Sequence, residues 1–526
     1  MSDYVVIGAG AAGCVIAARL SEDPDVTVTL IEAGPMDGAP ELEMPAAYSS
    51  TFHSRYDWDF PTEREPGLDG RQISITRGRV VGGSTALNAM VYTRGHREEY
   101  DRWEALGASG WNYDELLPYF RLSEDNQRGA DAYHGEGGPL TISDLILRHR
   151  LTDVLLEAAE EAGQPRNDDV NGADTEGLGS YQLFQRDGRR CSNAKAFLHP
   201  ALGRPNLTLE ADSHVTRILF QGDRAVGVEA VRFGAPATYR AEREVIVCGG
   251  AVQSPQILML SGIGPAAELS AFGIQPLVDL PVGRDLMDHT TLVMSWLTDE
   301  ESLLTAFTPE NLALFEAEGT GPMTSNYGGT GGFIRCSEDS TRADFQVFGI
   351  AALYTGGGVV TEHGLSIAGN PSRVRDRGAV TLRSADPLAK PRIQHNFMCH
   401  PEDRREMREG VRRMLELTDQ PAYRKLITAP YSVPDSRSDA DVDAYVRREG
   451  LTSYHQAGTC GIGRVVDPEL RVLGVEGLRV VDASVMPDLV GANTTAPTTM
   501  IGEKGADLIR GIDSRPAPST AVDAAA

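Results

Sequence analysis

Long apolar runs are missing from this sequence of 526 residues. No run reaches the roughly 18–20 residues that a membrane-spanning helix needs, so we expect no membrane span. An apolar strand begins as early as Tyr4, which leaves no room for a signal peptide before it. Both features favour a protein that stays in the cytoplasm.

Paired cysteines and clustered metal ligands are also missing. The six cysteines, at positions 14, 191, 248, 336, 399 and 460, form no Cys-x-x-Cys pair, so we expect reduced thiols. The eleven histidines include no His-Glu-x-x-His motif, and no metal site is predicted.

Positive charge is scarce. The chain has 49 lysines and arginines against 75 aspartates and glutamates, a formal net charge of −26. Such a charge repels nucleic-acid phosphates and anionic lipid headgroups, so we expect neither as a partner. The length allows two or more domains, and the hydrophobic content of 41% is ordinary for a globular protein.

A strand–turn–helix pattern occupies the first 34 residues. The apolar run from Tyr4 to Ile7 predicts a buried strand, and Gly8-Ala-Gly10-Ala-Ala-Gly13 follows it directly. The next residues, up to Leu20, have a helical pattern, and a second apolar strand ends just before Glu32. This order is typical of a dinucleotide-binding fold.

Each glycine of this fingerprint has a physical role. Gly8 permits the tight turn, Gly10 lets a pyrophosphate approach the backbone, and Gly13 lets the helix pack closely on the strand. The helix N-terminus attracts phosphates. Glu32 can accept hydrogen bonds from ribose hydroxyls and disfavours the 2′-phosphate of NADP. The pattern alone does not separate FAD from NAD.

A second glycine-rich segment covers residues 76–95. Gly78, Gly82 and Gly83 free the backbone there, and short polar side chains accompany them, namely Ser84, Thr85 and Asn88. Five apolar side chains of the segment would be exposed without reason in a surface loop: Val80, Val81, Leu87, Met90 and Val91. We therefore expect this segment to wrap a flat or anionic ligand.

The chain contains four separated motifs that follow one another along the sequence. Besides the fingerprint, they are GRVVGGSTALN (78–88), GAVQSPQILMLSGIG (250–264) and the C-terminal pair of SYHQAGTCGIG (453–463) with the stretch 480–509. With these motifs the chain resembles the glucose–methanol–choline (GMC) oxidoreductases, FAD-dependent alcohol oxidases and dehydrogenases, from about Tyr4 to Ile512. The resemblance implies an α/β fold, with a Rossmann-like FAD-binding domain and a substrate-binding domain built on a mostly antiparallel sheet covered by helices.

The resemblance also implies domains that alternate along the chain. The FAD-binding domain takes residues 1–150, 193–289 and 449–513, and the substrate domain takes 151–192 and 290–448. Residues 514–526 are expected to form a disordered tail because they are rich in small residues and proline. Amphipathic helices are predicted at 151–163, at 401–417 and after Ser438, and strands within 207–250.

The resemblance implies His455 as the catalytic base and Asn493 as its partner on the substrate oxygen. Oxidising an alcohol removes a hydroxyl proton, which suits a base with a pKa near neutrality, and a hydride, which suits flavin N5. The residues implied to contact FAD are Gly8, Gly10, Ala11, Ala12, Gly13, Glu32, Ala33, Arg79, Val81, Gly83, Ser84, Asn88, Ala89, Met90, Val91, Val215, Ala251, Asp482, Ala483, Thr494 and Thr495.

Three positions depart from the family pattern. Leu87 stands where choline oxidases carry a histidine bonded to FAD, so we predict non-covalent FAD. Thr495 replaces an asparagine of many bacterial members, and Gly461 replaces an arginine. His134 and His289 are interpreted as structural residues.

Other readings stay open at this stage. A hydroxynitrile-lyase-like or photodecarboxylase-like enzyme on the same fold, or a simple NAD-binding module, would share the fingerprint. The expected partners are a small alcohol and either oxygen or another electron acceptor, and the oligomeric state is open. Residues 300–360 contain no tryptophan for a cation cage, which favours a neutral primary or secondary alcohol, such as an aryl alcohol or a sugar-like polyol.

Overall fold

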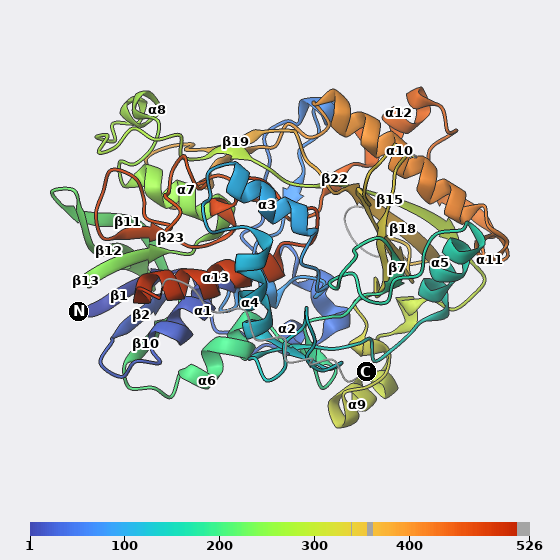
Figure 1. Cartoon of the computed structure of the whole chain (residues 1–526), viewed down its shortest axis with the longest axis horizontal. Coiled ribbons are helices and arrows are strands. Elements are labelled where there is room, and N and C mark those ends of the chain that lie inside the picture. Colours follow the sequence, from blue (N-terminus) through green and yellow to red (C-terminus); the bar gives the residue numbers. More distant parts are fainter. Residues whose placement is uncertain (338, 355–360, 513–526) are drawn as a thin grey trace, which may run out of the picture.

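The computed structural model describes residues 1–337, 339–354 and 361–512, so the predicted tail lies outside the described residues. Two large sheets stand at opposite ends of the molecule, each with its own helices (Figure 1). The first and last segments of the described chain both belong to the same end, where α1 contacts both β1 and α13 (Figure 1).

The first sheet has seven strands in the order β10-β2-β1-β13-β12-β11, with β23 beside β13. Their bounds are β1 (Ser2–Ile7), β2 (Val28–Ile31), β10 (Leu207–Glu210), β11 (Ser213–Gln221), β12 (Arg224–Arg232), β13 (Ala235–Val247) and β23 (Leu478–Val480). The strands β10, β2, β1, β13 and β23 pair in parallel, whereas β11, β12 and β13 pair antiparallel. The predicted strands of the fingerprint and of residues 207–250 are confirmed.

Helices α1 (Ala11–Leu20) and α13 (Thr495–Arg510) pack against each other beside this sheet (Figure 1). Gly502 makes the close contact possible, because a Cβ there would lie 3.1 Å from the Cα of Ala12. Helix α4 (Tyr113–Ser123) packs on α13, and α7 (Gly250–Leu260) packs on β11. The two ends of the chain are thus joined in one hydrophobic core.

The second sheet has six antiparallel strands in the order β16-β17-β18-β15-β21, with β22 beside β15. Their bounds are β15 (Thr290–Leu297), β16 (Thr330–Ile334), β17 (Phe345–Ile350), β18 (Gly364–Pro371), β21 (Ala429–Ser432) and β22 (Leu451–Thr452). Because side chains alternate along a strand, one face of this sheet packs against helices and the other face points to the interior of the molecule. The α/β architecture with a mostly antiparallel second sheet is confirmed.

Three predicted helices cover the second sheet or lie beside it. Helix α5 (Arg150–Glu161) and helix α10 (Pro401–Thr418) pack on β16–β18, and α12 (Asp439–Glu449) packs on α10. The apolar face of α10 is buried with the sheet, as predicted from its spacing. The Ser438 side chain accepts a hydrogen bond from the Asp441 N–H, which confirms the predicted N-cap.

The other described elements are shorter. The helices are α2 (Pro40–Glu43), α3 (Arg97–Ala105), α6 (His199–Ala201), α8 (Ala266–Ala271), α9 (Pro309–Glu318) and α11 (Pro421–Arg424). A third, three-stranded sheet joins β14 (Arg284–Leu286), β19 (Gly378–Thr381) and β20 (Arg392–Gln394). Two-stranded pairs join β3 (Phe60–Pro61) to β4 (Ser74–Ile75), β5 (Glu124–Asn126) to β6 (Leu140–Ile142), and β8 (Gln185–Arg186) to β9 (Arg189–Arg190), while β7 (Gly177–Ser180) lies beside β16.

Residues 35–75 contain short regular elements. Besides α2, β3 and β4, a 3₁₀ helix runs over Pro45–Thr51. Proline opens both α2 and this 3₁₀ helix, where its fixed φ favours a first turn.

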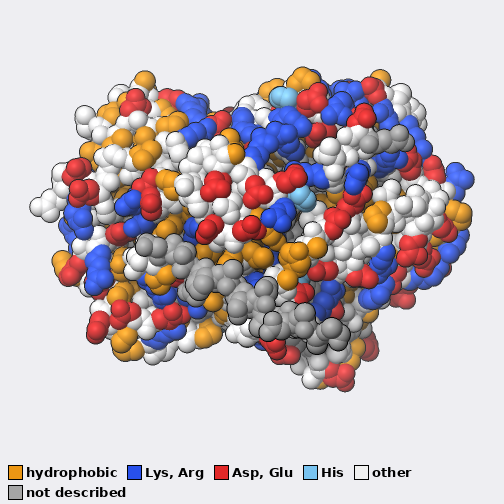
Figure 2. All heavy atoms as spheres, in the orientation of Figure 1, with side chains coloured by type: hydrophobic (Ala, Val, Ile, Leu, Met, Phe, Trp, Pro, Cys, Tyr) orange, Lys and Arg blue, Asp and Glu red, His pale blue; other side chains and the backbone are white. Residues whose placement is uncertain are grey.

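Charges of both signs are interspersed over the face seen in Figure 2. All six cysteines are free thiols. Over the described residues, we find no helix with the length and apolar character required to cross a bilayer.

Candidate functional site

A long cavity lies between the two large sheets and is lined by segments from both ends of the chain. At one end it meets the carboxyl ends of β1 and β2, at Ile7 and Ile31. At the other end it meets the inward face of the second sheet, at Val293 and Ala368. The cavity therefore offers a nucleotide-like end and a separate end for a smaller molecule.

The glycines of the fingerprint occupy the positions that their predicted roles require. Gly8 has a φ of +98°, which an L-residue rarely adopts. A Cβ on Gly13 would lie 1.9 Å from the carbonyl oxygen of Gly8, so only glycine allows the helix to pack so closely. A Cβ on Gly10, by contrast, would meet nothing nearer than 4.0 Å. Gly10 leaves open space in the cavity beside the N-terminus of α1, where phosphates fit.

Glu32 is buried at the end of β2 and lines the cavity. Burial raises the pKa of its carboxyl to about 7, although hydrogen bonds from the N–H groups of Gly34 and Ala9 oppose this. Each carboxylate oxygen accepts one of these bonds, which leaves lone pairs for further donors.

Two more helix N-termini reach the cavity. Asp482 accepts hydrogen bonds from the Gly250 N–H and the Ser254 hydroxyl, and so holds the start of α7. Asn88 Nδ2 donates to Thr495 Oγ1 at 3.0 Å, at the start of α13. The hydroxyl of Thr495 therefore contacts the glycine-rich segment. The N-termini of α1, α7 and α13, the positive ends of three helix dipoles, all reach the same cavity.

Most of the predicted cofactor residues line this cavity. They are Gly8, Gly10, Ala11, Ala12, Glu32, Ala33, Gly83, Ser84, Asn88, Ala89, Met90, Val91, Val215, Ala251, Asp482, Ala483, Thr494 and Thr495. Gly13, Arg79 and Val81 stand behind the lining, Gly13 at the helix–strand contact and Arg79 over the ring of Trp58. Three departures from common backbone geometry also lie here, because Met90, Tyr327 and Tyr454 have positive φ.

His455 and Asn493 meet in the middle of the cavity. Asn493 Nδ2 lies 3.2 Å from His455 Nε2, and both side chains line the cavity. On the other side of the ring, His455 Nδ1 lies 3.0 Å from His289 Nδ1. The backbone N–H of His455 donates to Asp288 Oδ1 at 2.8 Å, which fixes the loop that carries it.

The partners of His289 decide which nitrogen of His455 carries the proton. His289 Nε2 lies 3.2 Å from the Ser372 carbonyl oxygen, which can only accept, so Nε2 is protonated and Nδ1 is the acceptor. His455 must then donate through Nδ1, and its Nε2 is the unprotonated nitrogen, which accepts from the NH₂ group of Asn493 at 3.2 Å.

The orientation of Asn493 is fixed in the same way. Its Oδ1 accepts a hydrogen bond from Gln346 Nε2 at 3.0 Å and another from Thr93 Oγ1 at 3.1 Å. With its oxygen held by two donors, the amide turns its NH₂ group toward His455. Thr93 Oγ1 also accepts from the backbone N–H of Asn493 at 3.0 Å.

The pKa of His455 lies well below its usual value. Burial is the main cause, and His289 and the Arg77 guanidinium lower it further. Burial also lowers the pKa of His289 to about 4. At neutral pH both rings are therefore uncharged, and His455 Nε2 is available to take a proton.

Two segments of the chain match the models of one known family. The N-terminal GMC oxidoreductase model matches residues 2–291, and the C-terminal model matches residues 374–502. The chain belongs to the GMC oxidoreductase family. GMC oxidoreductases bind FAD, and this one is an FAD-dependent enzyme that acts on CH–OH groups. The open space at Gly10, the buried Glu32 and the three helix N-termini fit a dinucleotide with a pyrophosphate.

Named relatives are similar over nearly the whole chain. Mitochondrial choline dehydrogenase of Homo sapiens is 43% identical over 97% of this chain and 89% of its own length. An oxygen-dependent choline dehydrogenase of Sinorhizobium fredii is 40% identical over 97% of this chain and 96% of its own. The solved pyridoxine 4-oxidase from Mesorbium loti is 30% identical, with a TM-score of 0.90 over 97% of this chain and 99% of that one.

The substrate end of this GMC oxidoreductase is walled by aromatic rings. Tyr48 stands edge-on to Phe52 and to Tyr327, with ring centroids 6.0 and 6.3 Å apart, and Phe52 does the same to Tyr454 at 5.8 Å. Three of the aromatic residues within 300–360 line the cavity, namely Tyr327, Phe348 and Tyr354. Phe315, Phe333 and Phe345 are buried in hydrophobic cores, and Phe307 is exposed.

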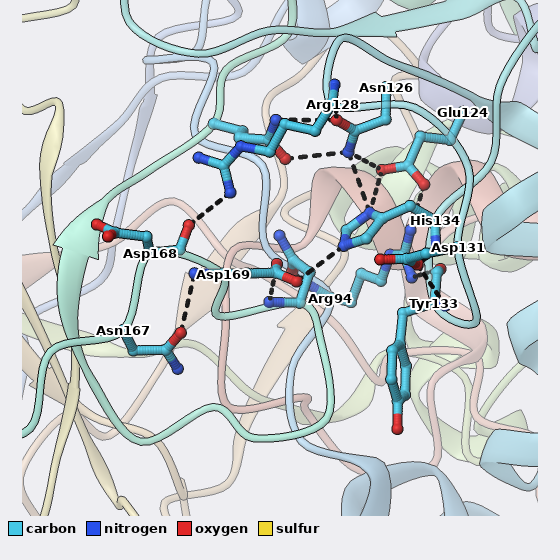
Figure 3. Close-up of polar contacts among 12 residues, drawn as sticks. Arg94, Glu124, Asn126, Arg128, Asp131, Tyr133, His134, Asn167, Asp168 and Asp169 are labelled. Atoms are coloured by element: carbon cyan, nitrogen blue, oxygen red, sulfur yellow. Dashed lines mark hydrogen bonds and ion pairs between the residues drawn. The ribbon is translucent and has the colours of Figure 1, made fainter. Parts of the chain in front are cut away.

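Arg94, the residue that follows Thr93 in the sequence, belongs to a buried ion-pair network (Figure 3). Arg94 pairs with Glu124 at 2.6 Å, and both side chains are about 1% exposed. His134 lies between two carboxylates, 3.1 Å from Glu124 and 3.0 Å from Asp169. Burial lowers the pKa of His134, but the hydrogen bonds to Asp169 and Glu124 outweigh burial and raise it to about 9. The network anchors the segment whose Thr93 orients Asn493.

One group among the described residues has the composition of a metal site, namely His53, Asp57 and Asp59. Its central carboxylate, Asp57, already accepts hydrogen bonds from the backbone N–H groups of His53, Asp59 and Arg77. These bonds identify it as the cap of a turn.

Sequence reasoning missed several residues of the site. His289 was read as structural, yet it contacts His455 directly. Thr93 and Gln346 orient Asn493, and Asn370 lines the cavity, although none belongs to a motif. Thr93 lies within the glycine-rich segment 76–95, whereas for Gln346 and Asn370 the available signal was an alternating strand pattern, which does not reveal what each strand faces.

Proposed function

We propose that this enzyme oxidises a primary or secondary alcohol to the carbonyl compound, with His455 as the base and Asn493 as the group that holds the substrate oxygen. One observation carries the proposal: the lone pair of His455 Nε2 and the NH₂ group of Asn493 converge in the cavity. A hydroxyl there can donate to the imidazole and accept from the amide at once.

His455, Asn493 and His289 have different roles in the proposed reaction. As the C=O bond forms, the hydroxyl proton would pass to His455 Nε2, and FAD bound in the cavity would supply the two-electron acceptor for the hydride of the C–H bond. The amide of Asn493 keeps the oxygen in place, since misplacement by about 1 Å can cost ~100-fold in rate. His289 keeps its acceptor nitrogen toward His455 Nδ1, so the imidazolium formed stays hydrogen-bonded.

The test is anaerobic mixing of the purified, FAD-loaded protein with a panel of alcohols. We expect loss of the oxidised-flavin absorbance and one carbonyl product for each flavin reduced. An unchanged flavin spectrum with release of cleaved products would instead favour lyase chemistry. Wild-type protein whose flavin no alcohol reduces would overturn the proposal.

We also propose that FAD is held without a covalent bond. Leu87, at the position where a histidine attaches the cofactor in choline oxidases, lines the cavity and has no nucleophilic atom. Precipitating the protein with acid should release all of the flavin to the supernatant. Flavin that stays with the precipitate contradicts this.

The names of the relatives bear on the electron acceptor and on the location in the cell. The names of the relatives include both an oxygen-dependent and a mitochondrial dehydrogenase. We propose a cytoplasmic enzyme that uses oxygen or another acceptor, and parallel assays with oxygen and with an artificial dye decide between the two.

The proposed substrate is neutral. Among the described residues that line the cavity, the carboxylates are Glu32 and Asp482, both placed near the predicted nucleotide contacts. The charged group beside His455 is the buried guanidinium of Arg77, which donates to the Tyr454 carbonyl at 2.6 Å. A quaternary ammonium group would find rings but no counter-charge there. Choline therefore belongs in the panel as the decisive charged comparison.

A further inference from the structure

Asn370 lies on β18 at the substrate end of the cavity and is fully buried. Its cross-strand partner on β17 is Gln346, whose Nε2 holds the oxygen of Asn493. Ala368 on β18 and Phe348 on β17 line the same cavity, as the alternation of side chains requires. Asn370 thus stands one strand away from the residue that orients the catalytic amide.

The polar atoms of Asn370 are not satisfied by the described protein. Its Nδ2 has a long contact of 3.4 Å to the Pro371 carbonyl, and its Oδ1 has no partner among the described residues. Gln346 Oε1 likewise has none. Buried polar groups almost always have a partner, because leaving one unpaired is costly. Two neighbouring amides with unpaired oxygens indicate that something else completes them.

We infer that Asn370 binds a second hydroxyl group of the substrate, so that the enzyme prefers a neutral diol, polyol or hydroxylated aryl alcohol. The inference rests on the proposed alcohol oxidation and adds the class of substrate. A hydroxyl can donate to Oδ1 and can also accept from Nδ2. A quaternary ammonium group can do neither, and a carboxylate would face the amide oxygen without a proton to share.

The surroundings of Asn370 fit such a molecule. Val293, Ala368 and Leu451 form a small apolar cluster, against which Phe348 and Tyr354 pack. These groups suit a carbon skeleton between the two hydroxyls, with the reacting one at His455 and the second at Asn370. Aromatic walls are a low-entropy way to hold such a skeleton.

The experiment compares matched pairs of alcohols that differ by one hydroxyl, such as 1,4-butanediol with 1-butanol and 3-hydroxybenzyl alcohol with benzyl alcohol. The variant is Asn370→Leu, which keeps the number and branching of the side-chain heavy atoms and removes the polar ones. For at least one pair we expect wild type to prefer the dihydroxy member, and the ratio of the two kcat/KM values to fall by about tenfold in the variant. Asn370→Ala gives the same comparison if the leucine variant does not fold.

Two controls separate recognition from structure. Thr330→Val removes a buried hydroxyl from the same sheet that donates to the Thr152 carbonyl at 2.9 Å and stands outside the cavity lining. It should lower Tm but leave the ratio unchanged. Asn370→Leu should not lower Tm, since it removes unpaired buried atoms. A clear loss of Tm in Asn370→Leu with an unchanged ratio would overturn the inference in favour of a structural amide.

Binding without turnover tells the two proposals apart. Alcohol titrations of His455→Ala, followed by the perturbation of the flavin spectrum, measure affinity alone. Tighter binding of the dihydroxy member, lost about tenfold when Asn370→Leu is added, supports the inference even if no alcohol reduces the flavin of wild type. Equal affinities for both members of every pair, or tight binding of choline alone, overturn it.

Discussion

Two histidines of this chain are both buried and have opposite pKa shifts. His455 is 7% exposed and His134 is 5% exposed. The pKa of His455 lies well below the usual value, whereas that of His134 is raised to about 9. One ring is neutral at the pH of the cell and the other is charged, within the same chain.

The partners of the two rings explain the difference. The His455 ring faces another imidazole and an amide, and the cation of Arg77 lowers its pKa further. His134 lies between the carboxylates of Glu124 and Asp169. Burial penalises the charged form in both places, and only carboxylates repay that cost. A buried imidazole without carboxylate partners therefore stays neutral and can act as a catalytic base.

The largest expected effect comes from removing the neutral ring. His455→Ala should bind FAD normally but slow flavin reduction by ~10²–10⁴, since the variant has no base for the hydroxyl proton. Rapid-mixing spectroscopy with a good alcohol measures the rate. His199→Ala, far from the cavity lining, is the matched control. A near-normal rate in His455→Ala would exclude the assigned role.

A substitution in the ion-pair network around Arg94 and His134 should change the free energy of unfolding and not the rate of flavin reduction. Glu124→Gln leaves the buried Arg94 without its counter-charge, which typically costs ~3–5 kcal/mol. Denaturant unfolding should show this loss as a lower midpoint. Glu402→Gln, an exposed surface pair, should change the midpoint little. Equal midpoints for the two variants would contradict the role given to the network.

A smaller effect on rate should follow from changing the partner of His455. In His289→Leu nothing accepts the Nδ1 proton, so the base loses its fixed tautomer, and we expect a loss of about 10–100-fold, as for other residues that orient a functional histidine. His289→Gln offers an amide oxygen in its place and should recover part of the rate. The pH dependence of kcat should move with the leucine variant, because His289 also lowers the pKa of His455. Identical rates in both variants would mean that His289 only fills space.

The smallest effect is a pH dependence of stability. The raised pKa of His134 adds stability that is fully present below its unfolded value of about 6.5 and disappears as pH rises through about 9. Unfolding midpoints between pH 6 and 9.5 should therefore fall in wild type with a slope that His134→Gln lacks. A parallel fall in both proteins would assign the slope to other groups.

The nucleotide end of the cavity could be predicted from sequence because its parts are consecutive. The strand, the glycines, the helix and Glu32 follow one another within 32 residues, and each has a conformational reason to be where it is. His455 and Asn493 could be placed together only through the family resemblance.

The substrate end could not be predicted, because its residues depend on sheet register. Gln346 and Asn370 become neighbours through the pairing of β17 with β18, and a shift of one strand by one residue would turn its side chain to the other face of the sheet. The contact between His289 and His455 likewise depends on tertiary packing across 166 residues of sequence. Patterns of apolar residues indicate that strands exist, but not what they face.

The position of β1 has a consequence for synthesis of the chain. It pairs with β2 on one side and with residues 241–247 on the other, and its helix α1 packs against residues 495–510. This apolar segment is therefore fully covered only when residues far along the chain have been synthesised. During that interval it is the natural binding site for a chaperone, and a prematurely terminated chain would leave it permanently bare.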